Sequence, residues 1–239
     1  APGGYNCPLA ESGAPFIFMN AAGTMDDVTT MVHEGGHAVH SFLAHNLSLS
    51  AFKEYPMEIA EVASMAMELF SMDHWQAFFG NDTEKLKQAK EHQLERVITI
   101  FPWIATIDAF QHWVYEHPNH TEEERAAAWT SILATFKIDA IDTSDVATYR
   151  QYSWQRQLHL FEVPFYYIEY GIAQLGAIGL WMQYKQNPQQ ALQNYINALQ
   201  LGGTKTLPAL YEAAGLKFDF SPEHIKTLMQ FVKAEMDAL

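Results

Sequence analysis

The sequence predicts a mainly helical protein, and three observations support that fold class. Apolar residues recur at three- and four-residue intervals through most of the chain, which is the period of an α-helix. Hydrophobic residues make up 49% of the 239 residues, enough for a sizeable buried core. Only one short apolar run, residues 15–20, has the composition of a strand. We therefore expect an all-α fold with a short β-strand near the N-terminus.

The first third of the chain is predicted to contain a loop, this strand and two helices. Residues 1–14 are rich in Gly and Pro, which favours a loop. After the strand, Thr24 is followed by acidic residues that complement the helix dipole, so a helix is expected over about 25–44. The next helix, over about 55–79, is apolar almost all round, which is typical of a buried helix.

The rest of the chain is predicted to form further helices with short connections. They are expected over 83–116, 121–137, 145–156, 165–184, 188–201, 206–214 and 221–238. The sequence has no repeat, no low-complexity run and no clear linker. We therefore expect residues 1–239 to form one helical catalytic domain.

Composition and charge exclude several classes of partner. The formal net charge of −14 argues against nucleic acid and against anionic membrane surfaces. No apolar run reaches the 18 residues that a membrane span needs. The N-terminus has neither an initiator Met nor the features of a signal peptide. We expect a cytoplasmic protein, and we expect this chain to be the C-terminal part of a longer one.

The stretch that carries chemistry is His-Glu-Gly-Gly-His at 33–37, the pattern typical of zinc peptidases. Residues four apart lie on one face of a helix, so both imidazoles can reach one metal ion. Glu34 lies about 100° round the helix from His33, close enough to act on water beside the metal without ligating it. Gly35 and Gly36 together cost a helix interior about 2 kcal/mol relative to alanine. We interpret the glycine pair as a point where another group approaches the helix backbone closely.

A catalytic zinc usually has three protein ligands and an open position. The single cysteine, Cys7, excludes a thiolate cluster, so the third ligand must be His or carboxylate. The apolar helix over 55–79 is the obvious source, because buried carboxylates must be paired, neutral or bound to a cation. Geometry does not choose among the candidates, and a buried ion pair is the structural alternative. The candidates are Glu54, Glu58 and Glu61, and Glu68 lies further along the same segment.

Two segments together resemble a known family. His-Glu-Gly-Gly-His-Ala-Val-His over 33–40 and Glu-Tyr-Pro-Met-Glu-Ile-Ala-Glu over 54–61 are similar to the thimet oligopeptidase and oligoendopeptidase F family of zinc metallopeptidases. In that family a glutamate at closely similar spacing completes the site, which here is Glu61. The resemblance implies that His33, His37 and Glu61 bind one Zn²⁺ per chain, with Glu34 as general base.

The resemblance continues to the C-terminus. Trp-Gln-Arg-Gln-Leu-His over 154–159 and Pro-Phe-Tyr-Tyr-Ile-Glu-Tyr-Gly over 164–171 are similar to the family's His- and Tyr-rich segment. This implies that His159, Tyr166 and Tyr170 bind the substrate carbonyl and stabilise the oxyanion. Tyr166 and Tyr170 share a face of the expected helix. The alternative is that these rings are core aromatics.

Family members are much longer than 239 residues, which implies a missing N-terminal helical portion that forms the other wall of the substrate channel. The groups that orient the two histidines through their distal nitrogens stay open, with Glu54, Glu58 and Ser64 as candidates. His40 shares the zinc-facing side of the helix one turn further on, and we expect it to make a supporting hydrogen bond.

These features predict a zinc endopeptidase that hydrolyses short oligopeptides. Two alternatives remain. A helical zinc carboxypeptidase would need clustered arginines, and only Arg150 and Arg156 lie near the site segments. The second alternative is a metal-binding fragment that is inactive without its N-terminal half.

Overall fold

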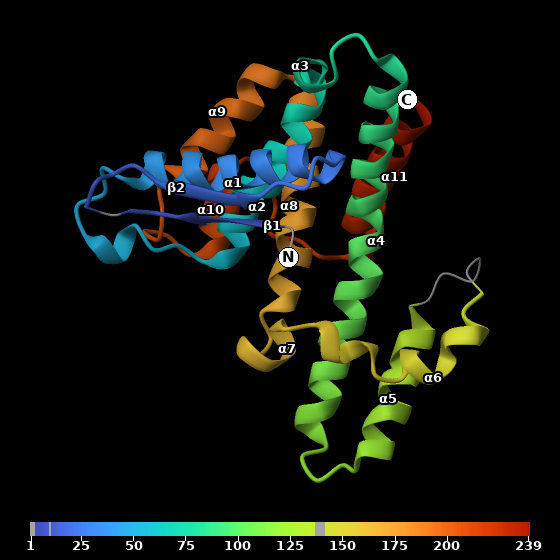
Figure 1. Ribbon diagram of the computed structural model, residues 1–239. Coiled ribbons are helices and arrows are strands. Elements are labelled where there is room, and N and C mark those ends of the chain that lie inside the picture. Colours follow the sequence, from blue (N-terminus) through green and yellow to red (C-terminus); the bar gives the residue numbers. More distant parts are fainter. Residues whose placement is uncertain (1–2, 10, 137–141) are drawn as a thin grey trace. The chain divides into compact units, whose positions relative to one another are not determined.

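The computed structural model describes residues 3–9, 11–136 and 142–239, and these are mainly helical, with one two-stranded sheet (Figure 1). The predicted fold class is confirmed. The chain folds into two compact units, which we describe separately. Unit 1 comprises Ala1–Arg96 and Ile172–Leu239, and unit 2 comprises Val97–Gly171. The assignment of one domain to the whole chain stays a prediction.

The sheet of unit 1 contains a strand that the sequence did not predict. β1 (Gly3–Cys7) pairs antiparallel with β2 (Phe16–Asn20), with Tyr5 opposite Phe18. The rings of this pair stack at a centroid distance of 5.5 Å. The prediction of a loop over 1–14 is therefore wrong for β1, because pairing with β2 and contact with a helix outweigh the low strand propensity of its glycines.

Helix α1 (Met25–Ala44) begins and ends as predicted and contacts both strands. Thr24 and Asp27 form a capping box at its N-terminus. The Asp27 carboxylate also accepts hydrogen bonds from the backbone N–H groups of Ala22, Gly23 and Thr24. These bonds stabilise the start of the helix that carries the His-Glu-x-x-His sequence.

Helix α2 (Met57–Ser71) packs on α1 and is the most deeply buried helix of unit 1. The predicted helix over 55–79 breaks after Ser71 into a 3₁₀ turn (Met72–His74) and the short helix α3 (Gln76–Phe79). At the break the Ser71 hydroxyl donates to the Glu68 carbonyl and accepts from the Trp75 indole. These side-chain bonds compete with the regular helical ladder.

The remaining helices of unit 1 follow the predicted order. Helices α4 (Thr83–Glu116) and α8 (Tyr167–Gln186) each have residues in both units. The others are α9 (Pro188–Leu199), α10 (Leu207–Ala213) and α11 (Pro222–Asp237).

Unit 2 is built around an aromatic core in which Trp129 is fully buried. The predicted helix over 145–156 is wrong, because a turn interrupts it between α6 (Ala147–Arg150) and a 3₁₀ segment (Ser153–Arg156). The Trp129 indole N–H and the Ser153 hydroxyl both donate to the Arg150 carbonyl, at 2.9 and 2.8 Å. A continuous helix would need that carbonyl for the backbone N–H of residue 154.

The other elements of unit 2 are α5, α7 and a first 3₁₀ turn. Helix α5 (Glu122–Thr135) opens with a capping box at Thr121. The end predicted for it, at 137, lies outside the described residues. The 3₁₀ turn spans Ser144–Val146, and α7 spans His159–Glu162.

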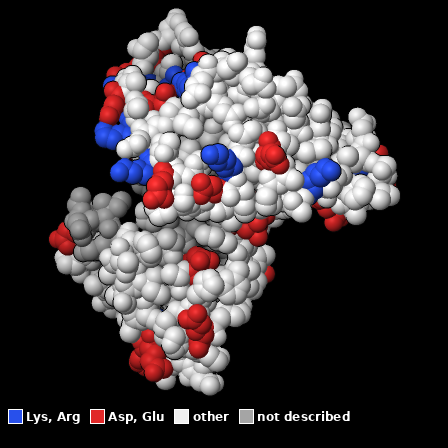
Figure 2. Space-filling model, turned by 180° about the vertical axis from the view of Figure 1, so that it is seen from behind, with Lys and Arg blue, Asp and Glu red and all other residues white. Residues whose placement is uncertain are grey.

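No helix in the described part of the chain combines the length and the apolar character that crossing a membrane requires. On the face shown in Figure 2, Asp and Glu side chains are scattered over a mostly uncharged surface.

Candidate metal centre

The structure brings His33, His37 and Glu61 together in unit 1. One ligand atom from each lies within 4.8 Å of the other two. The Glu61 Oε2 atom is 3.5 Å from His33 Nε2 and 3.9 Å from His37 Nε2. Two imidazole nitrogens and one carboxylate oxygen form a donor set that zinc commonly takes at catalytic sites. The residues present therefore fit a zinc ion.

Close packing of two helix backbones positions this group. A Cβ atom at Gly36 would lie 2.6 Å from the Ala63 carbonyl oxygen and from Ser64 Cα, so α1 can approach α2 only with glycine there. Gly35 differs, because a Cβ atom at that position would meet nothing within 4 Å. The close approach inferred from the glycine pair is thus explained at Gly36 by α2 itself.

Glu61 is the one carboxylate of the three candidates that reaches the histidines. It is buried, whereas Glu54 is exposed and Glu58 is half-buried outside the group. Ser64 lies one turn further along α2, and its hydroxyl donates to Glu61 Oε2 at 3.0 Å. This bond orients the carboxylate toward the two imidazoles.

The far nitrogens of the histidines have partners that the sequence reasoning missed. His33 Nδ1 lies 2.6 Å from Glu68 Oε1. His37 makes its hydrogen bond with the backbone of Ala60. Of the three candidates for these roles, Glu54 and Glu58 are not the partners, and Ser64 acts on Glu61 instead. The sequence contains one indication of the Glu68 contact, because Glu68 lies two helical turns after Glu61 on the same face of an apolar helix.

The two imidazoles have opposite electrostatic surroundings. Burial lowers the pKa of His33, but the hydrogen bond and charge of Glu68, with the charges of Glu61 and Glu34, raise it overall to about 9. Burial and the neighbouring His33 lower the pKa of His37 to about 3. Burial raises the pKa of Glu61, partly offset by His33 and Ser64. In the metal-free protein His33 is therefore the protonated member of the pair.

Glu34 is buried on α1 between the two histidines. Burial raises the pKa of its carboxyl, which His33 opposes and Glu68 reinforces. Strand β1 passes directly over this side chain, since a Cβ atom at Gly4 would lie 3.2 Å from Glu34 Cγ. A carboxylate with a raised pKa suits proton transfer near neutral pH.

His40, one turn beyond His37, does not make the supporting hydrogen bond that we expected. It is fully buried, and neither ring nitrogen has a hydrogen-bond partner among the described residues. Its ring stacks on Tyr55, with centroids 3.5 Å apart. Burial, with His37 nearby, lowers the pKa of His40 to about 3. The expected hydrogen bond is wrong, because this buried ring packs face to face on Tyr55 and no polar group among the described residues is within hydrogen-bond reach of its in-plane nitrogens.

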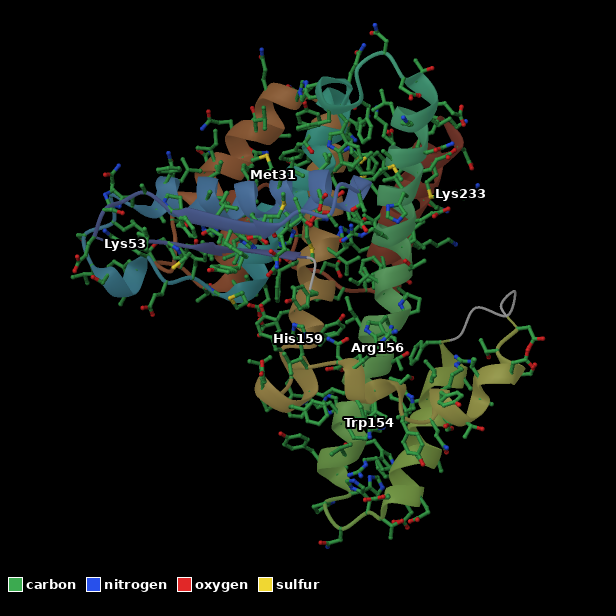
Figure 3. The ribbon with its side chains drawn as sticks, in the orientation of Figure 1. Met31, Lys53, Trp154, Arg156, His159 and Lys233 are labelled. Atoms are coloured by element: carbon green, nitrogen blue, oxygen red, sulfur yellow. The ribbon has the colours of Figure 1, made fainter. Side chains whose placement is uncertain are left out.

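His159, Tyr166 and Tyr170 lie together in unit 2. Figure 3 labels His159, and Trp154 and Arg156 just before it in the chain. Ring centroids of His159 are 5.7 Å from those of Tyr166 and Tyr170, and His159 Nε2 is 3.3 Å from the Tyr170 hydroxyl.

The helix predicted from 165 begins at Tyr167, so Tyr166 precedes α8 rather than lying on it. Phe165 has a positive φ of 61°, which is incompatible with a helix, and its backbone N–H donates to Gln111 Oε1 at 2.9 Å. Tyr166 nevertheless lies beside Tyr170, with centroids 5.3 Å apart. Tyr167 is buried in the core of unit 2.

The tautomer of His159 follows from its neighbours. The Trp103 indole, which can only donate, donates to Gln157 Oε1 at 3.0 Å. The Gln157 amide therefore presents its nitrogen to His159 Nδ1, 2.6 Å away. This makes Nδ1 an acceptor and leaves the proton on Nε2. Burial lowers the pKa of His159, which favours the same neutral form.

Comparison with known proteins identifies the family. The family model described as peptidase family M3 matches residues 1–230. This chain belongs to peptidase family M3. M3 peptidases are metallopeptidases, in agreement with the grouping of His33, His37 and Glu61.

Proteins similar to this chain include bacterial oligopeptidases. An oligoendopeptidase F homolog of Borreliella burgdorferi is 25% identical over 210 residues, covering 85% of this chain and 33% of the relative. The oligopeptidase PepF of Bacillus subtilis is 24% identical over 239 residues, covering 94% of this chain and 33% of the relative.

A solved structure of PZ peptidase A with an inhibitor has a TM-score of 0.90 and 30% identity, and the match covers all of this chain and 42% of that one. This chain spans about a third of the length of the two curated relatives from Borreliella burgdorferi and Bacillus subtilis.

Proposed function

We propose that this chain carries the catalytic zinc site of a peptidase that cleaves internal bonds of short oligopeptides. The observation that supports the proposal most is the group of His33, His37 and Glu61 on α1 and α2, in a chain of the M3 family. When bound, zinc would polarise the scissile carbonyl and lower the pKa of water. His33, His37 and Glu61 would hold the ion and leave one position open.

Glu34 is the proton carrier in this proposal. Its carboxylate takes a proton from the water that attacks the carbonyl carbon. It then gives that proton to the amide nitrogen as the C–N bond breaks, so the products are a carboxylate and an amine. The raised pKa of Glu34 and its burial beside His33 support this role.

The second part of the proposal assigns the oxyanion donors. His159 carries its proton on Nε2, as its contact with Gln157 indicates, so it offers an N–H donor. Tyr170 and Tyr166 offer hydroxyl groups beside it. Donors aimed at developing negative charge stabilise the transition state of acyl transfer.

The substrate class rests on the relatives. The relatives from Borreliella burgdorferi and Bacillus subtilis are named an oligoendopeptidase F homolog and an oligopeptidase. We propose short peptides as substrates of this chain for that reason.

The experiment combines metal analysis with one substitution. Purified chain should contain about one zinc per molecule at neutral pH, and Glu34→Gln should retain that zinc while its peptide turnover falls by at least about 100-fold. Mass spectrometry of the products of a blocked peptide distinguishes internal cleavage from removal of C-terminal residues. A chain without zinc, or a Glu34→Gln variant with normal turnover, would refute the assignment.

A second candidate is a metal-binding fragment that needs the rest of the protein to bind substrate. This candidate is favoured because the chain covers only 33% of the length of the two curated relatives. Turnover should be compared for this chain alone and for the chain mixed with a polypeptide that corresponds to the remaining portion of a relative. Turnover only in the mixture would favour the fragment.

A further inference from the structure

A buried glutamine from a third helix completes a ring of side chains around His33. Gln93 lies on α4, in the part that belongs to unit 1, and is 2% exposed. Its Nε2 atom donates to Glu68 Oε2 at 2.6 Å. The other Glu68 oxygen lies 2.6 Å from His33 Nδ1. At its other end, Gln93 Oε1 accepts a hydrogen bond of 3.3 Å from the Thr29 hydroxyl.

The ring returns to the helix on which it starts. Thr29 lies one turn before His33 on α1, so the path runs from α1 to α4, then to α2 and back to α1. Both Thr29 and Glu68 are buried, so no water competes freely for these bonds. Such a closed path restrains the rotation of every side chain in it.

The direction of each bond is determined by chemistry. An ionised carboxylate only accepts, so Glu68 must receive N–H groups from both His33 and Gln93. That orients the Gln93 amide, whose oxygen then faces the Thr29 hydroxyl. It also requires a proton on His33 Nδ1, which leaves Nε2 as the nitrogen on the Glu61 side, 3.5 Å from that carboxylate.

We propose that Gln93 is a positioning residue of the metal centre, which acts through Glu68 to hold His33 with Nδ1 protonated and Nε2 presented to the metal. The inference rests on the proposed zinc site and goes beyond its ligands. A carboxylate partner on a ligating histidine is a general feature of zinc sites. What this structure adds is the neutral donor that keeps that carboxylate in place, and its anchor on the ligand-bearing helix.

The test is zinc affinity of the full chain, measured by competition with a chromophoric chelator. Gln93→Met keeps the length of the side chain and removes both hydrogen bonds. We expect its zinc dissociation constant to rise about tenfold, as for other outer partners of zinc ligands. The matched control is Gln174→Met in the same unit, because Gln174 is also buried but its amide nitrogen has no hydrogen-bond partner among the described residues. Its dissociation constant should change less than twofold.

A second measurement separates positioning from general destabilisation. In ¹⁵N-labelled, zinc-loaded protein, His33 should show a protected proton on Nδ1, and this signal should weaken in Gln93→Met but persist in Gln174→Met. A second pair covers the case in which Gln93→Met does not fold. Thr29→Val removes the hydroxyl and should raise the dissociation constant about fivefold, whereas Thr29→Ser should restore it.

Failure of the inference can be distinguished from failure of the proposed function. If the wild-type chain binds no zinc at neutral pH, both fall. If the wild type binds zinc and the dissociation constant of Gln93→Met lies within twofold of the wild-type value, only the role of Gln93 is refuted. If Gln93→Met does not fold, the same criterion applies to Thr29→Val.

Discussion

At the scale of single residues, the surroundings of the two histidines in the candidate site favour different protonation states. Glu68 favours the protonated form of His33, whereas burial keeps His37 neutral. Glu61 accepts a hydrogen bond from Ser64 and faces the nitrogens of His33 and His37, and no Lys or Arg among the described residues forms an ion pair with it. A cation is the partner that this buried carboxylate would accept.

The choice of Glu61 over its neighbours is testable by substitution. Glu61→Ala should raise the zinc dissociation constant by more than the roughly 10–100-fold typical of a lost outer partner. Glu58→Ala should leave it nearly unchanged, because Glu58 lies outside the ligand group. Equilibrium dialysis against buffered zinc measures both, and the reverse order would show that Glu61 is not the third ligand.

His40 predicts part of the acid sensitivity of the metal-free protein. Its pKa is about 3 in the folded chain and near 6.5 when unfolded, so the unfolded state binds the extra proton between these values. Stability from His40 is therefore present above about pH 6.5 and is lost as the pH falls toward 3. His40→Phe keeps the stacking on Tyr55 and removes the titration.

Urea unfolding at pH 7 and pH 5, with a chelator present, measures this effect. The free energy of unfolding should fall less in His40→Phe than in the wild type, by on the order of 2 kcal/mol. Equal losses in the two proteins would show that His40 is already accessible to protons in the folded state.

At the scale of elements, the crossing of α1 and α2 decides whether the ligands meet. The first helix supplies both histidines and the second supplies Glu61, and they touch backbone to backbone at Gly36. Neither helix alone can form the site.

The two adjacent glycines of the His-Glu-x-x-His sequence should respond oppositely to alanine. Gly36→Ala forces α1 away from the Ala63 carbonyl, so we expect a loss of about 1–3 kcal/mol in the free energy of unfolding and weaker zinc binding. Gly35→Ala meets nothing within 4 Å and should gain up to about 1 kcal/mol from helix propensity. Thermal unfolding and zinc titration of both variants test this, and similar behaviour of the two would contradict the crossing geometry.

At the scale of the whole molecule, the predicted site residues fall in both compact units. The proposed metal ligands and Glu34 belong to unit 1, and His159, Tyr166 and Tyr170 belong to unit 2. Each group is organised within its own unit, by Glu68 in one case and by Gln157 in the other.

Zinc should stabilise the folded chain because it binds the assembled ligands and not the dispersed ones. A free zinc concentration 100 times the dissociation constant adds about 2.7 kcal/mol to the free energy of unfolding. Calorimetric melting in zinc buffers should therefore show a midpoint that rises with free zinc for the wild type and for Glu34→Gln. His37→Ala should lack the rise, and a zinc-dependent midpoint in that variant would place the ion elsewhere.

The sequence by itself determined the helical fold class and the bounds of α1, because periodicity and an N-terminal cap are local properties. It also supplied the pair of histidines and Glu34, since residues four apart on a helix share a face whatever surrounds them.

Only the tertiary structure decided what depends on contacts between distant segments. Strand β1 exists because β2 lies beside it, and the helix predicted over 145–156 breaks because Trp129 takes the carbonyl of Arg150. The grouping of Glu61 with the histidines and the ring through Gln93 likewise require three helices to pack at particular points. Chain-local patterns carry no information about those crossings, because they are set by packing between residues tens of positions apart.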